Sequence, residues 1–227
     1  MPLYDLVDFN VYNVESIVLP DGSRLYQKVV DGYRCPSATN GTWQDDNPAN
    51  RALGNYAPCI GAQAMPAQNG WCTLYPGNTF GTGSAGHGNS ESGGNISGIF
   101  SRMDWAARIA DITDGTSSTI AMGEIRPNCG DHHWNSWFYV NSLWTATTAP
   151  INYPISCRHE PSVPGATGSD CHNWNNWQTS QGFKSKHPGG AQFVFADGSA
   201  HFLSETIDYR TYQRLGDRRD NEPVGSY

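Results

Sequence analysis

Six cysteines constrain this chain more than any other feature. No two of them have the C-x-x-C spacing of a zinc or redox site, and an even number of widely spaced cysteines is typical of disulfides formed in an oxidising compartment. We therefore expect three disulfides. Sequence alone leaves many pairings open, and we expect near neighbours to join. The pairs are then Cys35 with Cys59, Cys157 with Cys171, and Cys72 with Cys129.

Composition favours turns and strands over long helices. The 227 residues include 25 Gly and 14 Pro, and only 15% are charged, but the 37% that are hydrophobic suffice for a core. A net charge of −7 argues against nucleic-acid binding, which needs a basic face. No apolar run is long enough to span a membrane, and no signal peptide precedes the first strand region. Because disulfides imply export, we expect an export segment that this sequence lacks.

Local patterns predict a few strands. Pro20–Ser23 is a turn between two apolar stretches, which predicts a hairpin over residues 17–30. The Asp114-Gly115 turn precedes a predicted buried strand over residues 119–122. The strongest signal is Asp197-Gly198 between the apolar runs 192–196 and 200–203. It predicts a hairpin with a type I′ turn, which needs positive φ at both central residues.

One short helix is predicted after this hairpin. Asp208 can cap a helix over Tyr209–Leu215, and Gly216 can end it as a left-handed residue. Residues 36–100 and 145–182 have loop composition, and no clean boundary or internal repeat divides the chain. We therefore predict one α+β domain over residues 1–227, with long loop insertions in those two ranges.

His187 and the pair Asp197-Gly198 are separated by nine residues. This spacing resembles the H-x9-DG signature of a large bacterial domain family of unknown function, abundant in planctomycetes. Further matching blocks follow the expected order along the chain. They are Leu3-Tyr4-Asp5 with Asp8-Phe9-Asn10, Cys35-Pro36-Ser37, Asp111 to Ile120 followed by Gly123-Glu124, and residues 207–224.

The resemblance implies a fold and a cellular role. Family members typically begin with a prepilin-type segment and look like type II secretion pseudopilins. The implied fold is a pilin-like head: an antiparallel sheet that would pack on an N-terminal helix, which is absent or truncated here, with long loops stapled by disulfides. The motif residues His187, Asp197, Gly198, Asp114, Gly115 and Glu124 are then structural.

A catalytic role for His187 is the weaker interpretation. An Asp can orient a His that acts as a base, but no motif places a nucleophile beside His187, and Asp197 is already explained by its turn. Tryptophans in polar surroundings could instead stack on sugars, although burial in a loop-rich core explains them too. These candidate ligand-binding residues are Trp134, Trp137, Trp144, Trp174 and Trp177.

Metal binding stays open at the level of sequence. Related pseudopilins bind calcium in a C-terminal loop, which makes Asp197, Asp208, Asp217 and Asp220 loose candidates, although no EF-hand pattern is present. Zinc is the weaker alternative, because its cysteine ligands would compete with disulfides. Its candidate ligands are Asp131, His132, His133, Cys157, His159, Cys171 and His172.

Three functions compete. The leading hypothesis is a structural, non-enzymatic subunit of an extracellular or cell-envelope assembly, whose partners are other pilin-like subunits. The second is a filament-displayed module that binds glycans or other extracellular ligands through aromatic loops. A hydrolase comes last, because no carboxylate pair or nucleophile motif supports it. Contact with a membrane is expected only through the missing N-terminal helix.

Overall fold

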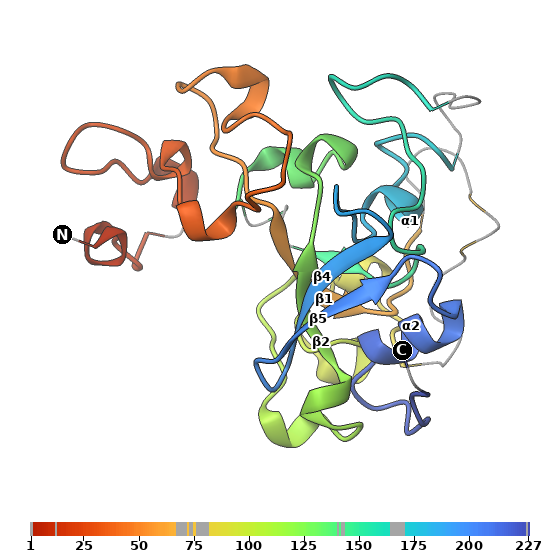
Figure 1. The fold of residues 1–227 in the computed structure, drawn as a ribbon. Helices are drawn as coiled ribbons and strands as arrows, with labels where there is room; N and C mark the ends of the chain where they lie inside the picture. The colour runs from red at the N-terminus through yellow and green to blue at the C-terminus, as the bar shows by residue number, and fades with distance from the viewer. Residues whose placement is uncertain are drawn as a thin grey trace.

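A five-stranded sheet organises the chain (Figure 1). The computed structural model describes residues 2–11, 13–66, 72, 75, 82–139, 141, 144–163, 171–225 and 227. The strand order is β3-β1-β2-β4-β5. The strands are β1 (Tyr56–Gly61), β2 (Ile120–Glu124), β3 (Thr145–Ala146), β4 (Gly190–Phe195) and β5 (Ala200–Ser204), and the helices are α1 (Trp177–Ser180) and α2 (Tyr209–Gly216). The α+β fold class expected from the sequence is confirmed.

Short 3-10 helices occur throughout the described loops, as expected for a chain rich in Gly and Pro. None is longer than four residues within the described part of the chain, so they turn the backbone without adding a layer to the fold. They are Leu3–Leu6, Val14–Ser16, Leu25–Gln27, Asp31–Tyr33, Gln44–Asp46, Gly86–Gly88, Gly93–Asn95, Ile109–Asp111, Thr116–Ser118, Pro127–Cys129 and His133–Asn135.

The sheet is antiparallel except at one edge. Strands β1, β2, β4 and β5 pair antiparallel, with Tyr56 opposite Glu124 and Gly123 opposite Phe193. Strand β3 pairs with β1 in parallel, which corrects the expectation of an antiparallel sheet. A parallel neighbour is possible here because 83 residues separate Gly61 from Thr145 (145 − 61 − 1), enough for a crossover.

The core lies on one face of the sheet. Alternate residues of β4 point inward, so Phe193 and Phe195 are buried while Gln192 and Val194 are exposed. Helix α2 packs on this face, next to β1 and β2. The buried cluster comprises Ala57, Cys59, Ile120, Ile125, Ile151, Phe183, Ala191, Phe193, Phe195, Leu203, Tyr212 and Leu215.

The β4–β5 hairpin is confirmed, but its turn differs from the predicted one. Only Gly198 has positive φ, at 86°. The Gly198 N–H donates to the Phe195 carbonyl at 2.9 Å, and the Phe195 N–H donates to the Ser199 carbonyl at 2.9 Å. The loop therefore holds three residues and ends in a left-handed glycine, whereas a two-residue type I′ turn needs two positive φ angles.

Helix α2 begins as predicted and ends for a different reason. The Asp208 carboxylate accepts from the Thr211 N–H at 2.8 Å, which is an N-cap. Gly216 is the last helical residue and is absent from the positive-φ glycines, so the predicted left-handed end is wrong. A Cβ on Gly216 would lie 2.2 Å from the Thr147 hydroxyl oxygen. Glycine is therefore needed at position 216 because the helix end packs closely against Thr147.

The described residues between 2 and 30 form an arm beside the sheet (Figure 1). The predicted turn is present, with the Leu19 N–H donating to the Ser23 carbonyl at 2.8 Å. The hairpin is much shorter than predicted: the antiparallel bridge Val18–Arg24 joins its arms, the Leu25 N–H donates to the Ile17 carbonyl at 3.1 Å, and the second arm then continues as a 3-10 helix. The arm has its own apolar cluster, made of Ile17, Leu19 and Leu25 packed against Leu3, Leu6, Val7, Val11, Trp137 and Phe138.

The two predicted loop insertions contain parts of the sheet. Strand β1 lies within residues 36–100, and β3 and α1 lie within residues 145–182. Strand β1 has the sequence Tyr-Ala-Pro-Cys-Ile-Gly, in which Pro58 and Gly61 mimic a loop. By contrast, β2 begins at Ile120, where a strand was predicted after the Gly115 turn. Among the described residues, no helix has the length and apolar character needed to cross a membrane.

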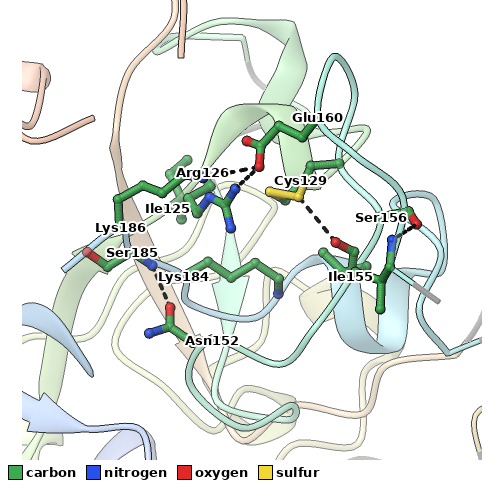
Figure 2. The surroundings of a disulfide bond; sticks show 12 residues. Ile125, Arg126, Cys129, Asn152, Ile155, Ser156, Glu160, Lys184, Ser185 and Lys186 are labelled. Carbon is green, nitrogen blue, oxygen red and sulfur yellow. Dashed lines mark hydrogen bonds and ion pairs between the residues drawn. A yellow bond between two sulfur atoms is a disulfide. The ribbon is translucent and has the colours of Figure 1, made fainter. Parts of the chain in front are cut away.

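Two disulfides tie the loops, and none of the predicted pairs forms. Cys72 joins Cys171, and Cys129 joins Cys157. Cys35 and Cys59 are free, so the third disulfide is also wrong. Cys129 and Cys157 are consecutive cysteines, but Cys72 and Cys171 lie 99 residues apart, and this long-range pair is what pairing by proximity along the chain misses. Figure 2 shows Arg126 and Lys186 converging on Glu160 beside Cys129, which forms the bridge to Cys157.

Candidate functional site

Three chemically active side chains from distant segments meet at one end of the sheet. The Nε2 atom of His187 lies 3.5 Å from Cys35 Sγ and 3.1 Å from Glu124 Oε1. The three ligand atoms all lie within 4.8 Å of one another. We call this group the Cys35–Glu124–His187 cluster. It unites three of the sequence blocks that were noted separately.

Strand pairing explains how the cluster assembles. Glu124 is the last residue of β2, which lies between β1 and β4, and His187 stands three residues before β4. The loop that carries Cys35 is held to the start of β1 by Asn55. The Cys35 N–H donates to Asn55 Oδ1 at 3.3 Å, and the Asn55 N–H donates to the Tyr33 carbonyl at 2.7 Å.

The cluster has a buried side at Glu124 and a side open to solvent at His187. Glu124 is 2% exposed, and its second carboxylate oxygen accepts the Gln192 N–H at 2.7 Å. The side chain of His187 is 29% exposed. A cavity of about 20 Å³ is lined by Cys35, Glu124, Asn55 and other residues. That volume accommodates a water molecule or an ion but no organic substrate.

Burial shifts the pKa values of several groups in and around the cluster. Burial raises the pKa of the Cys35 thiol, and Glu124 raises it further. Burial, with Cys35 and Glu124 as smaller causes, raises the pKa of Tyr56 to about 12. Lys184 lines the cavity, and burial lowers its pKa to about 7. Its ammonium group donates to the carbonyls of Thr179 and Gly182, at 2.7 and 3.3 Å.

The geometry differs from a nucleophile–histidine–acid relay. In such a relay the acid orients one imidazole nitrogen and the other takes the proton of the nucleophile. Here Cys35 and Glu124 both face the same nitrogen, Nε2 of His187. Asp197 is no partner of His187 either, because the six residues of β4 stand between them. Its carboxylate accepts the Ser199 N–H at 2.9 Å, within the turn.

The predicted tryptophans lie inside the loops rather than on an open platform. Trp144 is fully buried, and Trp134 is 7% exposed. Trp137, Trp174 and Trp177 are partly buried. The Trp137 indole N–H donates to the Lys28 carbonyl at 2.8 Å, and that of Trp177 donates to the Asp131 carboxylate at 2.7 Å. Packing explains most of this ring surface.

One arginine and one histidine ring pack against these tryptophan rings. The Arg158 guanidinium lies 4.9 Å from the ring centroid of Trp134 and 4.7 Å from that of Trp174. The His132 ring lies between Trp144 and Trp177, at centroid distances of 4.9 and 4.7 Å. These stacks hold loops of little secondary structure in place.

One groove near the cluster does present an aromatic wall, in part from a residue that the sequence reasoning missed. It has a volume of about 500 Å³ and is lined by Trp43, Trp134, Asp45, Asp46 and His159, among others. Three of these residues have positive φ: Asp45 at 52°, Asp46 at 53° and His159 at 60°. Left-handed backbone is uncommon for residues other than glycine, although Asp and His adopt it more readily than most side chains do.

The calcium candidates do not share a site within the described chain. Asp197 is held in its turn and Asp208 caps α2. Asp217 is fully buried, and its carboxylate accepts the Ser97 hydroxyl at 2.6 Å. Burial raises the pKa of Asp220 to about 6, with Asp217 and Asp114 as further causes.

The zinc candidates are dispersed as well. Cys157 and Cys171 are consumed by different disulfides. His159 faces Asp45 at 3.3 Å, and His172 Nδ1 lies 2.7 Å from the Pro154 carbonyl. His133 Nε2 lies 3.1 Å from the Thr145 hydroxyl, away from these groups.

The comparisons with known proteins identify a family. Neither the curated proteins nor the solved structures contain a match to the chain. One family model matches residues 1–210, which is most of the sequence and includes Cys35, Glu124 and His187. The chain therefore belongs to the bacterial family described as protein of unknown function (DUF1559).

Proposed function

We propose that the protein is an exported, non-enzymatic subunit of an assembly at the cell envelope, with a pilin-like head. The observation that carries this proposal is the pair of disulfides, which join segments 99 and 28 residues apart. Disulfides persist in oxidising compartments such as the periplasm and the cell surface. The resemblance of the sequence blocks to prepilin-type proteins supports the same role.

A surface suited to assembly lies on the N-terminal arm. An apolar groove of about 430 Å³ runs between the arm and the Trp137–Phe138 segment. Three of its aromatic residues are open to solvent, with Tyr4 73%, Phe9 66% and Tyr33 46% exposed. Apolar patches of this kind mark contact sites between proteins. We assign this groove to a neighbouring pilin-like subunit.

Site-specific photocrosslinking in the native host tests the assembly. A photoreactive residue at Phe9 is expected to give adducts with envelope subunits. The matched control is the same probe at Ile109, which is 77% exposed and lies outside the groove. Fractionation of the same cells should find the protein in the periplasm or at the surface. Equal crosslinking at both positions, or a cytosolic protein, would contradict the proposal.

A second candidate is a glycan-binding module, and the groove beside Trp43 favours it. A groove of about 500 Å³ is large enough for a sugar, and its wall combines an indole with carboxylates and an imidazole. Of the tryptophans that the sequence analysis named, Trp134 also lines this groove, and Trp43 is added to them. As a test, the protein is titrated with cell-wall polysaccharides while its tryptophan fluorescence is recorded. A saturable change that Trp43→Ala removes and Trp105→Ala preserves is expected if the groove binds sugars.

A further inference from the structure

We propose that Cys35, Glu124 and His187 bind one divalent transition-metal ion, with zinc as the preferred ion. The three side chains supply a sulfur, an oxygen and a nitrogen, which is the mixed ligand set of zinc rather than of calcium or magnesium. Among the described residues, one other group of this type exists, Cys129, Cys157 and Glu160. That group is occupied, because its cysteines form a disulfide.

The distances fit a tetrahedral ion. Bonds of about 2.3 Å to sulfur and about 2.0 Å to nitrogen and oxygen place sulfur about 3.6 Å from nitrogen, and nitrogen about 3.3 Å from oxygen. The measured separations from His187 Nε2 are 3.5 Å to Cys35 Sγ and 3.1 Å to Glu124 Oε1. One imidazole nitrogen facing both partners is unsuited to a proton relay, but it is the arrangement that three ligands around one ion produce.

The charges around the cluster favour a cation. Glu124 is a buried carboxylate that faces His187, which balances its charge only when the ring is protonated. Two nearby cations are engaged elsewhere: Lys184 with two carbonyls, and Arg126 with Glu160. A buried carboxylate without a compensating charge is costly. A divalent ion balances Glu124 and the Cys35 thiolate together. Binding breaks the S–H bond of Cys35 and releases the proton to solvent.

The supporting contacts resemble those of metal sites. Ligands are commonly oriented by hydrogen bonds from a second layer of groups. Here the Gln192 N–H holds the other oxygen of Glu124, and Asn55 holds the backbone of Cys35. The partly exposed His187 leaves a route for the ion and a fourth position for water or a ligand. The bound ion would join the Cys35 loop to β2 and to the segment before β4.

Metal titration of the folded, disulfide-intact protein tests the site. After dialysis against a chelator, the protein is titrated with Zn²⁺, and with Co²⁺ as a spectroscopic probe. We expect one ion per chain and a thiolate-to-cobalt absorption band. Cys35→Ala and His187→Ala should each weaken Zn²⁺ binding at least about 100-fold, because loss of even a supporting contact costs 10–100-fold.

Matched controls use the other free cysteine and another histidine. Cys59→Ala and His201→Gln should bind Zn²⁺ like the wild type. The proposal would be overturned if the wild-type protein bound less than one Zn²⁺ per chain, or if Cys35→Ala bound Zn²⁺ as tightly as the wild type. The three side chains would then be a hydrogen-bonded cluster without a metal.

A second measurement needs no variant. Alkylation of Cys35 in the wild-type protein is followed by mass spectrometry, with and without Zn²⁺. A zinc-bound thiolate should react at least about tenfold more slowly, since the ion occupies its nucleophilic electron pair. Equal rates would refute the site even if every variant misfolded.

Discussion

Removal of either disulfide should destabilise the protein strongly. A disulfide stabilises mainly by restricting the unfolded chain, and the effect increases with the length of the closed loop. Cys129 and Cys157 are separated by 28 positions, which corresponds to about 3.6 kcal/mol. The Cys72–Cys171 loop spans 99 positions but encloses the inner bridge, so its effective length is 99 − 28 = 71, or about 4.4 kcal/mol.

The assay is thermal and urea unfolding of two paired variants. One is Cys129→Ala with Cys157→Ala, and the other is Cys72→Ala with Cys171→Ala. For a chain of this length each kcal/mol lowers Tm by about 2–4 °C, so each variant should melt roughly 7–18 °C below the wild type. The outer pair should show the larger loss. Reduction of both disulfides in the wild-type protein should lower Tm by more than either paired variant does.

Two outcomes would refute this reasoning. If both variants melted within about 2 °C of the wild type, the loops would be held by packing alone, since the entropic term predicts several kcal/mol. A large loss for the inner pair combined with none for the outer pair would mean that the long loop is already restricted in the unfolded chain.

Three further perturbations have defined outcomes. Gly123→Ala places a Cβ 2.6 Å from the rings of both Phe183 and Phe193, so urea unfolding should show a loss of about 1–3 kcal/mol, whereas Gly32→Ala, which meets nothing within 4 Å, should change little. Asp208→Ala removes the N-cap of α2 and should cost about 1 kcal/mol in the same assay, and no loss would contradict the capping role. Burial lowers the pKa of His132 to about 4 and of His133 to about 3, below the ordinary 6.5. As the pH is lowered, the unfolded chain therefore binds protons before the folded protein does. The free energy of unfolding should then fall by roughly 1.4 kcal/mol per pH unit per histidine as the pH is lowered from about 6.5 to 4. A pH-independent unfolding midpoint in that window would show that the two rings are accessible to solvent.

Local signals predicted the elements whose shape depends on neighbouring residues. The β4–β5 hairpin, β2 after its glycine turn, and the Asp208 cap of α2 all depend on side chains within a few positions of one another. Strand β1 was missed because Pro58 and Gly61 interrupt the usual pattern of a strand. Its neighbours β2 and β3, not its own propensity, hold it in the sheet.

The candidate site was out of reach for a different reason. Cys35, Glu124 and His187 were each singled out, but as a disulfide half and as structural motif residues. Their meeting point depends on the strand order β1-β2-β4, which no short-range pattern contains. The cysteine pairing failed for the same reason, because proximity along the chain is a poor guide to proximity in a loop-rich fold.

The intact mass of the natively extracted protein tests the central claim most directly. Alkylation before and after reduction counts the free thiols in each state. An exported, disulfide-stapled subunit should gain about 4 Da on reduction and expose two free cysteines before it, Cys35 and Cys59, and six after it. Six free thiols and no gain in mass would instead describe a protein of a reducing compartment, and the cell-envelope role would have to be abandoned.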